Sequence, residues 1–245
     1  MSHAPPFVLV HARRIAARNP ETSAPIQPHA PRTCAPFVQA AMRPEFLWLA
    51  LYLPALPLEA YAPRPSPSAV VDHGTGAGRV VLGDAAAEQA GIVPGTGVAA
   101  ARALLPAITL LACSPEREAT ALHSLACAAG RLTPRISLMP DALLLEIGSC
   151  LRLFGGVERI VAMARDDARA QQFTVATAVA PTPLGAYWLA GYAQPSCETK
   201  PDAGHHSPLC LDRATLHRWL DHLPVDVLPK KAATALSRFG LRRLA

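Results

Sequence analysis

Two carboxylates, Asp141 and Glu146, lie in or beside a stretch of alternating apolar residues from Ser137 to Gly156, SLMPDALLLEIGSCLRLFGG. A two-metal centre for phosphoryl transfer needs several oxygen ligands to fix two Mg²⁺ ions, so Asp141 alone cannot hold one. We therefore expect Asp141 to be a turn residue and to hold no residual Mg²⁺. We expect the Glu146 side chain to face solvent from its strand or to pair with a nearby arginine.

Other residues that could bind a metal, bind phosphate or act as a nucleophile each lack part of the motif that such a site requires. His205, His206 and Cys210 could bind a metal, but they provide too few ligands at zinc spacing. The glycine cluster GTGAG at residues 74–78 has neither the Lys-Ser/Thr ending of a P-loop nor GxGxxG spacing, so we expect a hairpin turn there. A serine nucleophile has no supporting motif such as GxSxG. We therefore predict no metal or cofactor site from these residues.

The residues around the acidic pair have the pattern of a β-hairpin. Arg135–Met139 is the first expected strand, and Pro140 belongs to the turn because proline cannot donate to a central ladder. Apolar residues then alternate over Leu143–Ile147, which is the period of a strand. Far upstream, Phe46–Leu53 (FLWLALYL) is a nearly continuous apolar run, typical of a strand buried on both faces.

Strands and helices alternate through the rest of the chain. Ser114, followed by Pro115 and by two glutamates, predicts the start of a long helix that Gly130 ends. The other expected strands are residues 69–72, 79–82, 108–112 and 174–179, and the other expected helices are residues 84–90, 98–105, 157–171 and 184–192. This order predicts an α/β (α+β) fold.

The composition allows a sizeable core and favours an anionic partner only mildly. Hydrophobic residues make up 51% of the 245 residues, and the net charge is +5. We expect no membrane span and no signal peptide, because no apolar run has the required length or position. The six cysteines show no CxxC spacing and indicate reduced thiols in a cytoplasmic protein.

Two segments have no sustained periodicity. Residues 1–44 are rich in Pro, Ala, Arg and His, so we expect a disordered extension, and Met42 is an alternative start to Met1. Residues 194–208 are polar and rich in turn formers, which predicts a linker. The tail from residue 211 to residue 245 is helical in pattern and more basic than the rest.

Several motifs, taken in order, resemble the Y-family (UmuC-like) DNA polymerases. They are WLALYLPALPLEAY at residues 48–61, GDAAAEQAGIVPGTGVAAARALLP at residues 83–106, the central hairpin, and LPVDVLPKKAATALSRFGLRRLA at residues 223–245. The LRLFGG ending of the hairpin is most similar to the ImuB-type members of this family.

The resemblance implies a domain organisation. A palm-like domain is expected at residues 45–56 and 112–199, with a fingers-like domain at residues 57–111 between its two parts. A linker and a partial helix-hairpin-helix thumb are expected at residues 200–245. The thumb motif has Val225-Asp226-Val227 where the family has Gly-x-Gly, which weakens the case for phosphate contact at that turn.

The chain departs from the family at the positions that bind the catalytic metals. Counted back from Glu59, which matches a glutamate of the family, the first metal-binding Asp falls at Ala50. The palm Asp-Glu pair falls at Asp141-Ala142 or, in the alternative register, at Pro140-Asp141. One carboxylate remains in either register, so the resemblance places only Asp141 at the metal site.

The nucleotide-binding positions have changed as well. The Tyr and Arg that hold the incoming triphosphate fall at Ala85 and Glu88, and a glutamate would repel a triphosphate that an arginine attracts. The aromatic gate against ribonucleotides falls at Ala55, and the triphosphate lysine falls near Pro183.

The resemblance and its departures together imply a non-catalytic adaptor, not an enzyme, in damage-induced (SOS) translesion synthesis and mutagenesis. The partners implied are DNA, the sliding clamp, a RecA-like companion protein and an error-prone replicative-type polymerase. We expect DNA contact from the basic tail, at Lys230, Lys231, Arg238, Arg242 and Arg243. Two alternatives are an active error-prone DNA polymerase with an unusual metal set and a generic α/β binding module.

Overall fold

The computed structural model describes residues 46–74, 76–192, 208–225, 228 and 230–243. The predicted disordered extension of residues 1–44 lies outside this part of the chain, as does most of the predicted linker at residues 194–208. Among the described residues, no helix is both long and apolar enough to cross a membrane. The described cysteines, Cys113, Cys127, Cys150 and Cys210, all have free thiols.

The centre of the molecule is a four-stranded antiparallel sheet with the strand order β5-β6-β1-β7. Strand β1 lies inside this sheet and pairs along its whole length with β6 on one side and with β7 on the other. The strands are β1 Trp48–Tyr52, β5 Ile136–Leu138, β6 Ala142–Glu146 and β7 Ala176–Ala180.

The apolar sequence of β1 explains why this strand is central. Leu49 and Leu51 are fully buried in a cluster on one face of the sheet, whereas Ala50 is fully buried in a second cluster on the other face. Each fully buried leucine contributes roughly 1.5–3 kcal/mol relative to an exposed one. The prediction of a strand buried on both faces is therefore confirmed.

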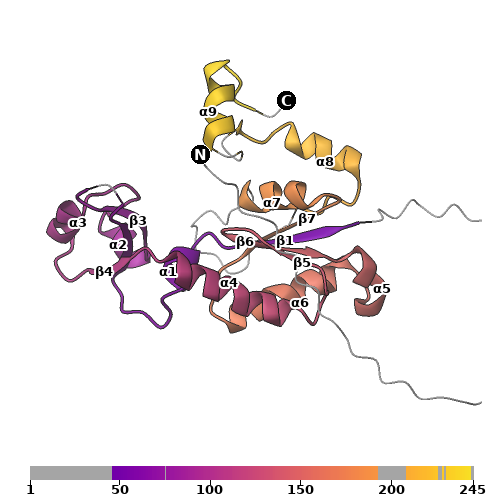
Figure 1. Ribbon diagram of the computed structural model, residues 1–245, viewed down its shortest axis with the longest axis horizontal. Helices are drawn as coiled ribbons and strands as arrows, with labels where there is room; N and C mark the ends of the chain where they lie inside the picture. Colours follow the sequence, from indigo (N-terminus) through magenta and orange to yellow (C-terminus); the bar gives the residue numbers. More distant parts are fainter. Residues whose placement is uncertain (1–45, 75, 193–207, 226–227, 229, 244–245) are drawn as a thin grey trace, which may run out of the picture.

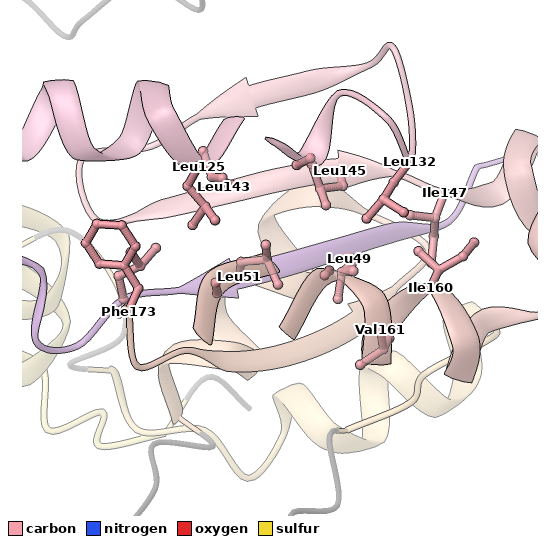
Figure 2. Close-up of a cluster of buried hydrophobic side chains, with 14 of the residues drawn as sticks. Leu49, Leu51, Leu125, Leu132, Leu143, Leu145, Ile147, Ile160, Val161 and Phe173 are labelled. Carbon is pink, nitrogen blue, oxygen red and sulfur yellow. The ribbon is translucent and has the colours of Figure 1, made fainter. Parts of the chain in front are cut away.

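Two long helices cover the first face of the sheet, α4 (Pro115–Ala129) and α6 (Val157–Ala170). Ser114 caps α4 as predicted, since its side chain accepts a hydrogen bond from the Arg117 N–H. Figure 2 shows the apolar side chains that meet between these helices and the sheet, which are Leu49, Leu51, Leu125, Leu132, Leu143, Leu145, Ile147, Ile160, Val161 and Phe173.

Helix α7 (Pro183–Tyr192) packs on the opposite face, and α8 (Arg213–Leu220) and α9 (Lys230–Arg238) lie farther out on the same side (Figure 1). The segment before α8 is tied to the edge strand β7. The Val179 N–H donates to the Pro208 carbonyl at 2.9 Å, and the Cys210 N–H donates to the Val179 carbonyl at 2.8 Å. Residues beyond the predicted linker thus share a core with the sheet, through Cys210, Leu216 and Leu223.

A second, three-stranded sheet of order β3-β2-β4 lies at one end of the molecule (Figure 1). Its strands are β2 Ser68–Asp72, β3 Arg79–Gly83 and β4 Thr109–Ala112, and its helices are α2 Ala85–Gln89 and α3 Val98–Leu104. The GTGAG segment connects the antiparallel strands β2 and β3, so the prediction of a hairpin turn is confirmed. The short helix α1 (Leu56–Glu59) links this sheet to β1.

The central hairpin has the predicted form. Strands β5 and β6 are antiparallel, Pro140 and Asp141 lie in the turn between them, and the Met139 N–H closes the turn on the Ala142 carbonyl at 2.8 Å. After β6 the chain forms a 3-10 turn (η1, Gly148–Cys150) and the short helix α5 (Leu151–Phe154), and then enters α6 through a pair of glycines.

The turn after β6 requires a glycine at position 148. A methyl group on Gly148 would lie 2.9 Å from Glu146 Oε1 and 2.9 Å from the Leu47 backbone nitrogen, which is closer than ordinary contact. Gly148→Ala is expected to lower the free energy of unfolding by about 1–3 kcal/mol, measured by urea denaturation. Gly191→Ala is the control, because its nearest neighbour is 3.9 Å away and alanine favours a helix. Equal stability of the two variants would contradict this account.

Candidate functional site

The position of the expected first metal ligand, Ala50, lies at the middle of β1. Its neighbours across the sheet are Leu144 on β6 and Ala178 on β7, and helix α7 packs over this face. Ala50, Leu144 and Ala178 are all at most 1% exposed. A hydrated metal ion would therefore meet an apolar, closely packed surface at this point, with no oxygen ligand from residue 50.

The one carboxylate of the degenerate site, Asp141, is partly buried at the turn before β6. Its backbone carbonyl accepts a hydrogen bond from the Leu53 N–H at 2.9 Å, which fixes the turn beside the end of β1. Its Oδ1 accepts a hydrogen bond from the Tyr187 hydroxyl of α7 at 2.9 Å. Burial raises the pKa of Asp141, and the hydrogen bond from Tyr187 opposes part of that rise.

Sequence reasoning did not identify Tyr187 or its aromatic neighbour Tyr52. The two rings pack edge to face, with 6.2 Å between their centroids and an interplanar angle of 66°. Burial raises the pKa of Tyr187, and the charge of Asp141 raises it further. The hydroxyl therefore stays protonated and donates a hydrogen bond to Asp141. One feature of the sequence could have identified Tyr187. It lies one helical turn after Pro183, and the resemblance places the triphosphate lysine near Pro183.

The second acidic residue of the hairpin, Glu146, is only 1% exposed, so the prediction that it faces solvent or pairs with an arginine is wrong. Its carboxylate accepts hydrogen bonds from the Ser149 N–H at 3.2 Å and from the Ser149 hydroxyl at 2.8 Å. Both faces of β6 are covered, so the alternating pattern does not produce an exposed side here. Glu146 therefore stabilises the turn that leads into α5.

The residues at these positions do not fit a two-metal centre. Ala50 and Ala142 offer no oxygen ligand from their side chains and are fully buried, which leaves Asp141 as the one carboxylate of the set. Among the described residues, no three His, Cys, Asp or Glu side chains come together in a way that could hold a metal ion. Two Mg²⁺ ions need more oxygen ligands than this arrangement supplies.

Of the three residues considered as metal ligands, His205, His206 and Cys210, the structure describes only Cys210. His205 and His206 lie outside the described residues. Cys210 is fully buried in the apolar cluster under α7 and α8, and burial raises the pKa of its thiol to about 11. Because a metal binds the thiolate, Cys210 is poorly suited to be a ligand.

The triphosphate positions lie on α2 of the second sheet, at its exposed surface. Ala85 and Glu88 are both exposed, and Asp84 caps this helix by accepting from the Ala87 N–H at 2.9 Å. Burial alone would raise the pKa of Asp84, but hydrogen bonds from Ala87, Ser66 and Ser68 outweigh it, and the pKa is lowered. This end of α2 therefore presents acidic side chains where a nucleotide-binding site would present an arginine.

The residues that the sequence predicts to contact DNA lie on and after α9. Arg238, Arg242 and Arg243 are exposed, while the side chains of Lys230 and Lys231 lie outside the described set. The Val225 N–H donates to the Arg242 carbonyl at 3.1 Å, so the chain after α9 returns to the segment before it. Three cationic side chains are thus presented to solvent close to one another in sequence.

A hollow of about 720 Å³ lies away from Asp141, where α1, α4 and the end of α6 meet. Its lining includes Arg117, whose guanidinium lies 4.8 Å from the centroid of the Tyr61 ring, and Glu59. Glu59 is buried and accepts a hydrogen bond from the Thr174 N–H at 2.9 Å. The glutamate from which Ala50 was located by counting back therefore holds α1 near the start of β7.

Comparison with known proteins decides the family. A sequence model of the impB/mucB/samB family matches residues 59–190, which is more than half of the chain. The chain belongs to this family. No curated protein sequence gives a significant match.

Solved structures of Y-family DNA polymerases have the same fold as this impB/mucB/samB family member. An insertion ternary complex of Dbh DNA polymerase matches with a TM-score of 0.57 and 17% identity, covering 81% of this chain and 59% of that one. DinB from Sulfolobus solfataricus matches with a TM-score of 0.56 and 17% identity, covering 81% and 58%. The chain thus spans less than two thirds of the length of these polymerases.

The predicted resemblance to Y-family polymerases is confirmed by both comparisons, and the predicted α/β palm-and-fingers fold is confirmed by the structural one. At this level of identity the structures establish the fold of this impB/mucB/samB family member. Its chemistry has to be argued from its own side chains.

Proposed function

We propose that this chain is a non-catalytic, ImuB-type member of the Y family that engages DNA as an adaptor in damage-induced (SOS) translesion synthesis. The observation that carries the proposal is the burial of Ala50 beneath α7, among Leu144 and Ala178. A polymerase of this family would need a solvated carboxylate at that point to hold a metal ion. Here the same point is part of the core.

The remaining positions support the same conclusion from other parts of the reaction. The partner of Asp141 in the metal-binding pair is missing in either register, because neither Ala142 nor Pro140 has a carboxylate. Glu88 replaces an arginine that would neutralise the charge of the triphosphate. These changes affect both metal binding and nucleotide binding. Because such residues act together in catalysis, restoring one of them would not restore activity.

An adaptor still has to hold DNA and a working polymerase. The exposed cations Arg238, Arg242 and Arg243 provide phosphate contacts that need no catalytic residue. The family resemblance implies that the working partner is an error-prone replicative-type polymerase, with a RecA-like companion protein and the sliding clamp in the same assembly. The alternative of an active error-prone polymerase is favoured by one observation, the retention of Asp141.

The first test is primer extension by the purified chain on a primed template, with all four nucleotides and either Mg²⁺ or Mn²⁺. We expect no extension, while fluorescence anisotropy at low salt shows that the same primed DNA is bound. The matched control is Asp141→Ala, which should likewise show no extension. Template-dependent extension that disappears in Asp141→Ala would refute the adaptor and establish an enzyme.

The second test concerns the basic C-terminal residues. Arg242→Ala combined with Arg243→Ala is expected to weaken DNA binding and to reduce the slope of log K against log salt by about 0.7–0.9 for each lost phosphate contact. Adding Lys230→Ala and Lys231→Ala should weaken binding further. The control pair is Arg152→Ala with Arg159→Ala, two exposed arginines on α5 and α6. An equal loss of affinity in the control pair would exclude the C-terminal part as the DNA-binding surface.

A further inference from the structure

The carboxylate left at the metal site joins two distant parts of the chain. The Tyr187 hydroxyl donates to Asp141 Oδ1 at 2.9 Å, across 46 residues of sequence. Asp141 belongs to the turn of the β5–β6 hairpin, and Tyr187 belongs to α7. This bond therefore connects the sheet to the helix that covers the face where catalysis would occur.

A third residue, Tyr52 at the end of β1, completes the contact. Its ring packs edge to face against the Tyr187 ring at 6.2 Å, an arrangement that stabilises aromatic pairs beyond their buried area. A methyl group on Gly191 would lie 3.9 Å from Tyr52 Cε2, so the ring also lies against α7 one turn further along. The residue opposite Tyr52 on β6 is Ala142, which is fully buried.

Helix α7 in turn positions α8. A methyl group on Gly185 would lie 2.9 Å from Leu216 Cδ2, so the two helices approach each other closely at this glycine. Leu216 is buried in the apolar cluster that includes Ala186 and Leu189 of α7. Movement of α7 on the sheet would therefore move α8, which leads to the basic C-terminal residues.

We propose that Asp141, Tyr187 and Tyr52 form a clasp that fixes α7, and through it α8, on the palm sheet. In this chain the carboxylate at the former metal-binding turn serves as the acceptor of a charge-assisted hydrogen bond. The clasp sets the placement of the C-terminal helices relative to the sheet. This inference does not require the proposed adaptor function, because it concerns contacts within the chain.

The test is a double-mutant cycle on the full chain, measured by urea unfolding. Tyr187→Phe and Asp141→Ala are each expected to lower the folding equilibrium constant about tenfold, the size of a hydrogen bond to a charged group. The double variant should be as stable as the less stable of the two single variants, because both changes remove the same hydrogen bond. Asp141→Asn keeps an acceptor oxygen and should lose less than Asp141→Ala. Additive losses in the double variant would overturn the clasp.

Hydrogen exchange provides a readout that separates the clasp from general stability. In Tyr187→Phe under native conditions, the exchange rates of the α7 and α8 amides are expected to rise at least about threefold more than those of the α4 and α6 amides. The control is Tyr192→Phe, at the half-exposed end of the same helix, which should leave all four helices unchanged. Equal acceleration in all four helices, or no acceleration in α7 and α8, would show that the contact does not position them.

Discussion

The structure depends on the burial of β1 on both faces. Leu49 and Leu51 fill the core under α4 and α6, and Ala50 faces the core under α7 and α8. A strand in that place can hold a polar side chain only if each of its polar atoms finds a partner, because an unpaired polar group is costly to bury. The expected position of the first metal ligand is therefore also the position where the C-terminal helices attach to the sheet. Residue 50 cannot both pack against apolar side chains and bind a metal ion.

This constraint explains how the fold can persist without a carboxylate at position 50. Alanine at position 50 allows α7 to pack closely on the sheet, and the cations that we propose to contact DNA lie elsewhere, on and after α9. The polar groups that remain near the site have become structural. Asp141 accepts from Tyr187, and Glu146 accepts from Ser149, so each carboxylate stabilises a turn or a helix. Both carboxylates of the hairpin therefore contribute to the fold.

Local patterns in the sequence predicted much of the fold and part of the site. The apolar run at Phe46–Leu53 predicted a strand covered on both sides, and Ser114 predicted the start of α4. Burial of Glu146 could not be predicted, because the alternating pattern of β6 does not reveal that α7 covers its second face. The bond between Asp141 and Tyr187 joins residues far apart in sequence, and the contact of Val179 with residues 208–210 likewise depends on the assembled sheet.

The most direct test of the central claim is the stability of Ala50→Asp. A carboxylate placed at this fully buried position, among apolar neighbours, is expected to lower the free energy of unfolding by about 3–5 kcal/mol. Millimolar Mg²⁺ should not restore the loss, since the one other carboxylate of the set, Asp141, accepts a hydrogen bond from Tyr187 and supplies too few oxygen ligands. Ala85→Asp, at an exposed position on α2, is the matched control and should be tolerated. An Ala50→Asp variant as stable as the unchanged chain, or one that Mg²⁺ stabilises, would show that this face still forms a metal site.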